Sequence, residues 1–275
     1  MKPKSFTYVR PSSVDEAVQM LARWGAEARI LAGGQSLVPM LNFRLLEAQV
    51  LIDISGLAPL AYIREADGHI EVGAATTQAQ FMAWPRLAEL APLLSLALPH
   101  VGHYQTRSRG TVCGSIAHAD PSAELSLCLA TIGGSVVMKS SRGTRVLPCD
   151  DFQTGMLMTA RLPDELIIAV RFATRSPGAG YAFAEMAKRQ GDLALCAVAA
   201  MVSGKTTRLG VGGVAEKPTV REWSGLVDGE IDDALNDFAW ALGATDDHHA
   251  AAGYRRGLVR RLGRKVIEEA RKCSN

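Results

Sequence analysis

The chain has 275 residues, of which 48% are hydrophobic and 21% charged, and this is enough apolar material for two or three packed units. Its 30 Lys+Arg and 28 Asp+Glu leave a formal net charge of +2, too small a global field to draw the chain to nucleic acid or to an anionic membrane. The composition also excludes an intrinsically disordered chain.

Neither a membrane anchor nor a metal centre is expected in this chain. The longest nearly uncharged apolar run, Leu193 to Val202, is far shorter than the roughly 20 residues that span a bilayer, and no apolar segment follows the charged start. The five cysteines are odd in number and form no C-x-x-C pair, which argues against a disulfide framework, a zinc site or an iron–sulfur cluster. We therefore expect a cytoplasmic protein.

The first quarter of the chain combines a helix, strands and a glycine pair. Ser13 to Glu16 has the form of a capping box and predicts a helix that ends at Gly25. Arg29 to Ala32 predicts a short buried strand that runs into Gly33-Gly34, and Ser36 could cap a short helix after it. Further elements are expected as strands at 50–54 and 69–74 and helices at 78–84 and 87–97.

Asp120-Pro121 is typical of a helix start, with Asp120 as N-cap, and the apolar spacing predicts that this helix runs to Gly133. Strands are expected at 135–139 and 166–172, before a boundary loop at 176–180. The remaining prediction is a sheet followed by two helices, with strands at 181–186, 193–202 and 207–214 and helices at 231–242 and 250–272. Strands and helices in separate runs favour an α+β fold.

Two segments carry the signature of a phosphate site. Ala32 to Ser36 places glycines between a strand and a helix start, where main-chain N–H groups can face an anion. Arg109 to Pro121 holds Gly110, Gly114 and several hydroxyls and also leads into a helix. Two such loops could hold a pyrophosphate from opposite sides, and a branched side chain at Gly33 would fill the phosphate space.

These two segments resemble the two FAD-binding motifs in the medium, flavin-carrying subunit of molybdenum hydroxylases, the family of carbon monoxide dehydrogenase and xanthine dehydrogenase. The resemblance extends over essentially the whole chain. It implies an FAD-binding domain of the vanillyl-alcohol oxidase type at residues 1–176, with subdomains of about 1–56 and 57–176. A C-terminal α+β domain would follow at 177–275.

The resemblance also implies the residues that bind FAD. Residues 32–36 would donate to the pyrophosphate, Thr111, Gly114 and Ser115 would close it from the other side, Asp120 would meet ribitol or ribose hydroxyls, Ile167 would flank the flavin or adenine, and Lys188 would contact the flavin. The full expected set is Ala32, Gly33, Gly34, Gln35, Ser36, Leu37, Gly110, Thr111, Gly114, Ser115, Asp120, Ile167 and Lys188.

Two of these assignments leave alternatives open. Cys113 and Ser115 stand where the family usually has Gly and Asn, so the Cys113 side chain either narrows the phosphate space or points away from it. The alternative role for Asp120 is that of a helix N-cap. His100, His103 and His118 lack a third ligand at a recognisable spacing, and His248-His249 are expected in the first turn of the last helix.

The resemblance implies a flavin electron-transfer subunit with no catalytic residue of its own. Substrate, an N-heterocycle, an aldehyde or carbon monoxide, would be oxidised at a molybdenum–pterin centre in a large partner subunit. Electrons would pass through two [2Fe-2S] clusters in a small partner subunit to FAD and then to an external acceptor, within a dimer of heterotrimers. A free-standing FAD-dependent reductase and a scaffold subunit that has lost FAD remain the alternatives.

Overall fold

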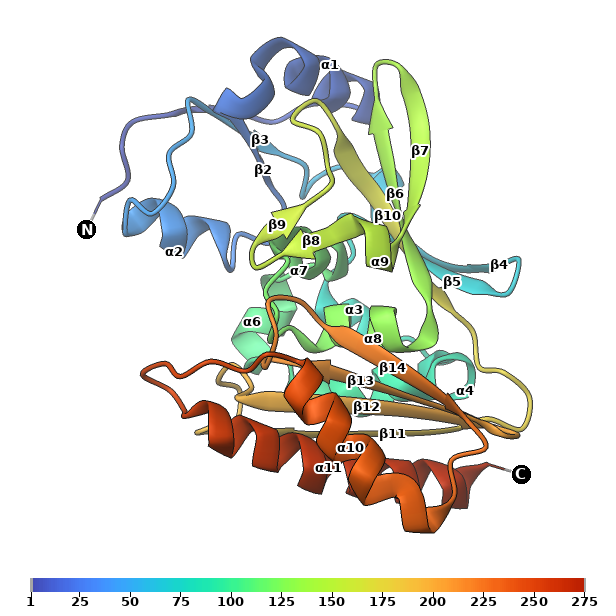
Figure 1. Ribbon diagram of the computed structural model, residues 1–275. Helices are drawn as coiled ribbons and strands as arrows, with labels where there is room; N and C mark the ends of the chain where they lie inside the picture. Colours follow the sequence, from blue (N-terminus) through green and yellow to red (C-terminus); the bar gives the residue numbers. More distant parts are fainter. Residues whose placement is uncertain (1, 275) are drawn as a thin grey trace.

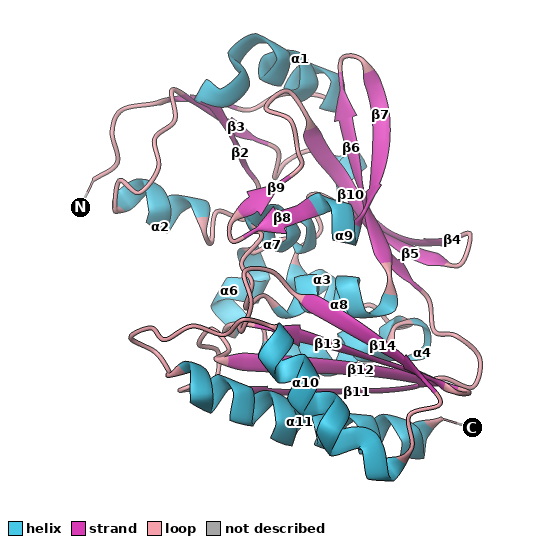
Figure 2. Cartoon of the chain, viewed as in Figure 1, coloured by secondary structure: helices cyan, strands magenta, loops and turns pink. Residues whose placement is uncertain are grey.

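The structure, a computed structural model, describes residues 2–274 and has the expected α+β class. Three main sheets take their strands in turn from residues 7–53, 63–173 and 180–224. The first two sheets both lie in the upper half of the molecule and the third lies in the lower half, with most of the short helices between the second and third sheets (Figure 1, Figure 2). The domain limits at 56 and 176 stay a prediction.

The first sheet is parallel and has the order β1 (Thr7–Val9), β3 (Val50–Asp53), β2 (Ala28–Leu31). Helix α1 (Val14–Trp24) follows β1, and the Ser13 hydroxyl accepts a hydrogen bond from Glu16 N. The capping box is only half formed, because the Glu16 carboxylate accepts from Ser12 rather than from Ser13. After Gly25, with φ of 49°, a 3-10 turn η1 (Gly25–Glu27) leads into β2, and α2 (Leu37–Asn42) follows β2.

The second sheet is antiparallel, with strand order β4 (Ile63–Ala66), β5 (His69–Gly73), β10 (Leu166–Ala173), β6 (Gly134–Ser140), β7 (Gly143–Pro148). Short elements lie before, within and beside it: η2 (Ala58–Leu60), α3 (Gln78–Met82), α4 (Leu87–Leu90), α5 (Pro92–Ala97), η3 (Leu98–His100), α6 (Tyr104–Arg109), α7 (Val112–His118), α8 (Glu124–Ile132), α9 (Cys149–Phe152) and the hairpin β8 (Gln153–Gly155) with β9 (Met158–Thr159).

The third sheet is an antiparallel meander of β11 (Gly180–Met186), β12 (Cys196–Ser203), β13 (Thr206–Gly212) and β14 (Thr219–Ser224). After η4 (Asp228–Glu230), helices α10 (Ile231–Ala241) and α11 (Ala252–Cys273) cover its outer face (Figure 1). Alternation along β12 fixes the layers. Val198 and Ala200 pack with α10 and α11, whereas Ala197 and Ala199 join the core that extends through the first two sheets.

Several predicted boundaries were wrong for local reasons. The helix expected over 87–97 is broken into α4 and α5, because Pro92 excludes the helical conformation at Ala91, which has φ −140° and ψ 65°. The helix expected from Asp120 begins at Glu124, with Ala123 as its N-cap. The Asp120 carboxylate instead accepts from Ser122 N at 2.8 Å and closes a turn.

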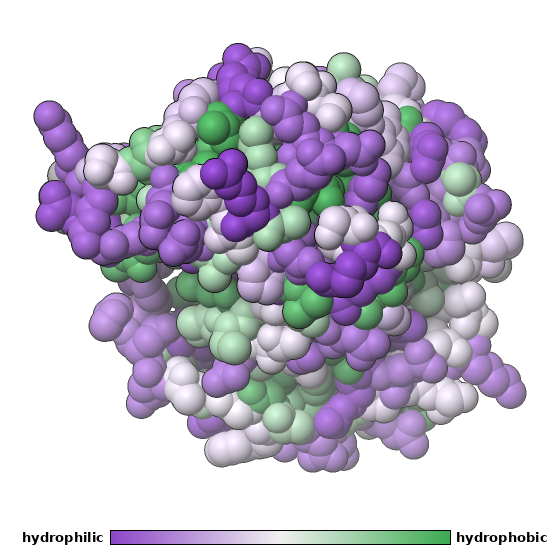
Figure 3. Space-filling model, turned by 90° about the horizontal axis from the view of Figure 1, so that it is seen from above, coloured by the Kyte–Doolittle hydropathy of each residue, from purple (hydrophilic) through white to green (hydrophobic). Residues whose placement is uncertain are grey.

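Other differences concern elements with weak sequence patterns. Strand β12 begins at Cys196 rather than at 193, and β1, β4, β7, β8, β9 and β14 were not predicted. Most of these strands lie at sheet edges or in the small hairpin, where one or both faces are exposed. His248 and His249 lie before α11 and not in its first turn. The space-filling view shows a mixed surface, with polar side chains and scattered apolar ones (Figure 3).

Candidate FAD-binding site

A cavity of about 660 Å³ gathers segments from all three sheets. The loop after β2, the start of α7, the beginning of β10 and the turn after β11 all line it. Twelve of the thirteen expected site residues lie on its wall: Ala32, Gly33, Gly34, Gln35, Ser36, Leu37, Gly110, Thr111, Gly114, Ser115, Asp120 and Ile167. Two turns about 75 residues apart in sequence therefore meet at one cavity.

Gly33 is the residue at which these two turns touch. A Cβ added there would overlap the Arg109 carbonyl oxygen and stand 2.7 Å from Gly110 Cα. The structure thus gives a further reason for this glycine: a side chain would push the two turns apart. The neighbouring Gly34 has φ of 73°, a conformation that favours glycine.

The first turn presents main-chain donors to the cavity. The N–H groups of Gly33, Gly34, Gln35 and Ser36 donate to no protein acceptor among residues 2–274. The Gln35 side chain donates back to the Gly33 carbonyl at 3.1 Å, which fixes the turn, and the Ser36 hydroxyl makes no cap bond. Unpaired N–H groups that line a cavity are suited to an anionic ligand.

The second turn is built differently from the expected loop, because α6 and α7 occupy most of it. Thr111 is the N-cap of α7, and its hydroxyl accepts from Gly114 N at 3.0 Å. Val112 N and Ser115 N donate to the carbonyls of Thr76 and Thr111, so these amides are not free for a ligand. This side of the cavity therefore offers a capped helix start and the Ser115 side chain rather than a second open row of amides.

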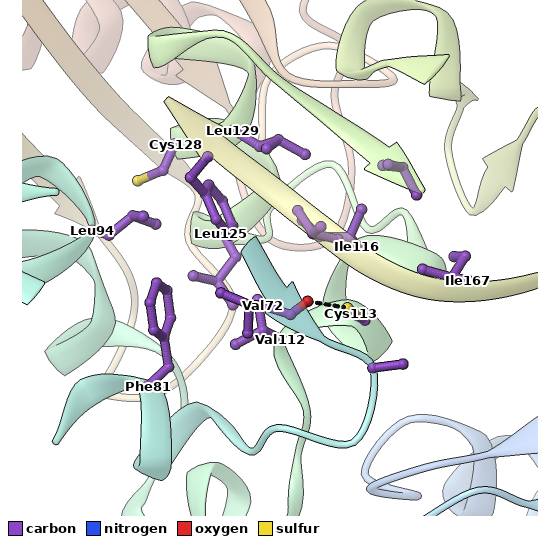
Figure 4. Packing of buried hydrophobic residues seen from close by; sticks show 14 of the residues in the cluster. Val72, Phe81, Leu94, Val112, Cys113, Ile116, Leu125, Cys128, Leu129 and Ile167 are labelled. Carbon is purple, nitrogen blue, oxygen red and sulfur yellow. Dashed lines mark hydrogen bonds between the residues drawn. The ribbon is translucent and has the colours of Figure 1, made fainter. Parts of the chain in front are cut away.

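Cys113 does not obstruct the cavity. It is 3% exposed, and its Sγ faces the Val72 carbonyl of β5 at 3.4 Å, within the apolar core (Figure 4). Burial raises the pKa of the Cys113 thiol far above its usual range, so the thiol stays protonated. Cys113 is among the residues that line the cavity, but its Sγ is directed to the Val72 carbonyl, in agreement with the second of the two possibilities left open by the sequence.

Lys188 is the one expected site residue that lies apart from the others. It lies in the exposed turn between β11 and β12 and does not line the cavity. Gly191, Asp192 and Leu193 of the same turn do line it. Gly191 has φ of 82°, a conformation that favours glycine. A Cβ at this position would stand 2.6 Å from the His103 ring. The loop therefore packs closely on residues 102–103 where it reaches the cavity.

A group of polar wall residues comes from distant segments that no sequence motif marks. Gln78 Oε1 is buried and has no hydrogen-bond partner in the described chain, although its side chain lines the cavity. A buried acceptor without a donor is costly and indicates a missing partner. No sequence motif marks Gln78, whose place is set by the bond from its N–H to the Gly110 carbonyl at 2.8 Å.

Two arginines bring positive charge to the same wall. Arg29 and Arg161 line the cavity and make no ion pair with a carboxylate of residues 2–274. Burial and the nearby charge of Arg29 lower the pKa of Arg161, which remains cationic at neutral pH. Guanidinium groups without a carboxylate partner offset the negative charge of a diphosphate.

These features together fit FAD. Segments from all three sheets and their connecting loops line the cavity. The wall offers unpaired N–H groups and two arginines to the diphosphate. Gln78 offers an unused acceptor to a donor group such as a hydroxyl or ring N–H. Asp120 and Ile167 add a carboxylate and an apolar wall.

Comparison with known proteins identifies the family. Residues 4–173 match the model of the FAD binding domain in molybdopterin dehydrogenase. The chain belongs to the FAD-binding medium subunits of molybdenum hydroxylases. It is 36% identical to the 6-hydroxypseudooxynicotine dehydrogenase complex subunit alpha of Paenarthrobacter nicotinovorans over 98% of this chain and 96% of that protein. It is 31% identical to the carbon monoxide dehydrogenase medium chain of Afipia carboxidovorans, with 98% of each covered.

Solved structures of this family share the fold over the full chain. A chain of the Cu,Mo-CO dehydrogenase superposes with a TM-score of 0.94 at 29% identity and 100% coverage of both chains. A chain of quinoline 2-oxidoreductase from Pseudomonas putida 86 gives a TM-score of 0.91 at 32% identity and 99% coverage of both. The expected fold, an FAD-binding domain with a C-terminal α+β unit, is thus confirmed for this medium subunit.

Two findings describe what the chain lacks within residues 2–274. No helix there combines the length and apolarity needed to cross a bilayer. No group of three or more His, Cys, Asp or Glu side chains in that range is placed to hold a metal ion.

Proposed function

We propose that this chain is the flavin electron-transfer subunit of a cytoplasmic molybdenum hydroxylase, assembled as a dimer of heterotrimers. In this complex a large subunit with a molybdenum–pterin centre oxidises the substrate, and a small subunit with two [2Fe-2S] clusters passes the electrons to this chain. FAD supplies the redox chemistry when bound, and passes the electrons to an external acceptor. The substrate class is an N-heterocycle, an aldehyde or carbon monoxide.

The observation that carries this proposal is the convergence of two glycine turns on one cavity. The turn at 33–36 would hold the diphosphate through its unpaired N–H groups, with Ser115 and the start of α7 on the opposite side. Asp120 would accept from sugar or ribitol hydroxyls, and Ile167 would pack against a ring. Lys188, expected at the flavin, does not line the cavity, and residues 191–193 of the same turn would take this role.

We place the flavin ring at the end of the cavity formed by residues 191–193 and the segment 120–124. Leu193 is 67% exposed there, so this end opens to the surface. A ring that exchanges electrons with a partner protein needs an edge near the surface. Arg29 and Arg161, also in the cavity wall, would offset the negative charge of the diphosphate.

The two alternatives are disfavoured by specific observations. A scaffold without FAD was suggested by Cys113, but the Cys113 side chain lies in the core and leaves the cavity open. A free-standing reductase would require an acid that protonates its substrate. The relative with 36% identity is instead a subunit of a dehydrogenase complex, which favours the subunit role.

Purification from the native cell tests the proposal. We expect a yellow complex with one larger and one smaller subunit, molybdenum, iron and FAD, measured by metal analysis and by flavin absorbance after acid release. A yellow chain that is active alone and free of both metals would support the reductase, and a colourless chain would support the scaffold.

A further inference from the structure

Two buried glutamates, one of them in the cavity wall, have no lysine or arginine in the described part of the chain to balance their charge. Glu124, the first residue of α8, is 8% exposed and lines the cavity. Glu185, on β11, has a side chain that is 6% exposed and does not line it. No lysine or arginine of residues 2–274 forms an ion pair with either carboxyl. Buried carboxylates without partners are costly, so an additional role is expected.

Glu185 connects this pair to the surface. Its Oε1 is 3.2 Å from Nδ1 of His100, whose side chain is 41% exposed, while its Oε2 is buried and has no partner. The His100 ring also packs against Phe183, with centroids 5.2 Å apart. Glu185 is thus connected to solvent through His100, and its charge also acts on Glu124 in the cavity wall.

The surroundings of the pair are almost entirely apolar. Across the sheet, Glu185 is opposite Ala197 on β12, and helix α5, which packs on β11, contributes no charged residue. The other ionisable groups near Glu124 are Asp120, in the turn before α8, and the protonated thiol of Cys128 on α8. The outer face of β11 is covered by α11, and Glu185 lies on the opposite face, with Phe183.

We propose that Glu124 and Glu185 form a proton-accepting pair that takes up a proton from solvent, through His100, when FAD in this cavity is reduced. This inference rests on the proposed function for the presence of FAD and for the source of the electrons. Two electrons add two negative charges to the cavity. The proton that the ring does not take is bound by a carboxylate, which becomes a neutral carboxylic acid, and solvent supplies both protons.

The acid strengths of the pair suit this role. Burial raises the pKa of Glu124 to about 7, with further contributions from the charges of Glu185 and Asp120. Burial likewise raises the pKa of Glu185 to about 7. Groups with such values are partly deprotonated at neutral pH, and added negative charge nearby raises their pKa, so they gain protons when the cofactor is reduced.

The test measures how many protons accompany two-electron reduction of the FAD-loaded full-length chain. The midpoint potential of the flavin is followed spectroelectrochemically from about pH 6 to about pH 9, and its slope gives the proton number. The key variants are Glu185→Gln and Glu124→Gln, which keep the side-chain size. Glu269→Gln, at an exposed position on α11, is the matched control.

At about pH 7.5 we expect the wild-type chain and the control to take up roughly half a proton more per reduced flavin than either pair variant. If Glu124→Gln lowers the FAD content, the proton number of Glu185→Gln is the deciding measurement, because Glu185 does not line the cavity. Equal proton numbers in wild type and Glu185→Gln, with FAD fully bound, would overturn the inference. A wild-type chain that binds no FAD would instead overturn the proposed function.

Discussion

Single glycines decide how closely the two turns of the FAD cavity approach. Gly33 faces the Arg109 carbonyl and Gly110 Cα, and a Cβ at Gly114 would stand 2.7 Å from Thr111 Oγ1, where it would displace the hydroxyl that caps α7. The sequence marks these glycines but gives a different reason for them. They are needed for the contact between two protein segments, which in turn shapes the space for a ligand.

Gly33→Val is therefore expected to lose FAD while the chain stays folded. The added side chain would separate the two turns, and the four N–H groups of residues 33–36 would no longer face the second turn. The ratio of flavin to protein absorbance measures the loss, and circular dichroism checks the fold.

Gly257→Ala provides the matched control for this variant. Its Cβ would meet nothing within 4 Å, and Gly257 lies inside α11. We expect full FAD content and about 0.5–1 kcal/mol of added stability. Stoichiometric FAD in Gly33→Val would show that the approach of the two turns is not required for binding.

Among the elements, β4, β5 and β10 are joined by one buried carboxylate. Glu71 on β5 is 4% exposed and accepts from Tyr62 at 2.7 Å, from Arg64 at 2.5 Å and from Arg171 at 2.7 Å. Burial opposes ionisation, but these hydrogen bonds outweigh it and lower the pKa of Glu71. The charged form thus holds the edge of the second sheet together.

Glu71→Gln is expected to lower the free energy of unfolding by about 2 kcal/mol at neutral pH, because the amide leaves buried donors poorly paired. Since the folded-state pKa is lowered, this contribution is present above the unfolded value, near 4.5, and is lost as the pH falls through the folded-state pKa. Urea unfolding at neutral and at acidic pH measures both. A difference between variant and wild type that does not shrink in acid would contradict this assignment.

At the scale of the whole molecule, the cavity joins the three sheets. Its wall includes the loop after β2, the helices α3, α6, α7 and α8, the start of β10 and the turn after β11. The third sheet also shares its inner face with the core of the other two through Ala197 and Ala199. A ligand in this cavity therefore contacts segments that only the folded chain brings together.

FAD is expected to stabilise the folded chain as a whole, because its cavity is lined by segments next to all three sheets. Because it binds the folded state alone, free FAD at 100 times its Kd should add about 2.7 kcal/mol to the free energy of unfolding. Thermal unfolding followed by fluorescence and by circular dichroism, with and without added FAD, measures the shift. FMN, which lacks the adenosine end, is the control. An unfolding temperature that FAD does not change would contradict the cavity assignment.

The sequence by itself determined the order of the main strands, the two long C-terminal helices and both glycine turns. These depend on local patterns: alternation, helical spacing and glycine between strand and helix. It failed at Asp120, where a side chain bonded to Ser122 N moved the helix start to Glu124, and at 87–97, where Pro92 broke a helix.

Only the tertiary structure decided which residues share the cavity. Gln78, Arg29, Arg161 and Glu124 carry no motif, and Lys188 lies in the expected turn but outside the wall. Likewise, the unpaired oxygen of Glu185 and the inward direction of Cys113 depend on packing between distant elements. The physical reason is that burial and charge balance are properties of neighbours in space, which the order of residues along the chain does not specify.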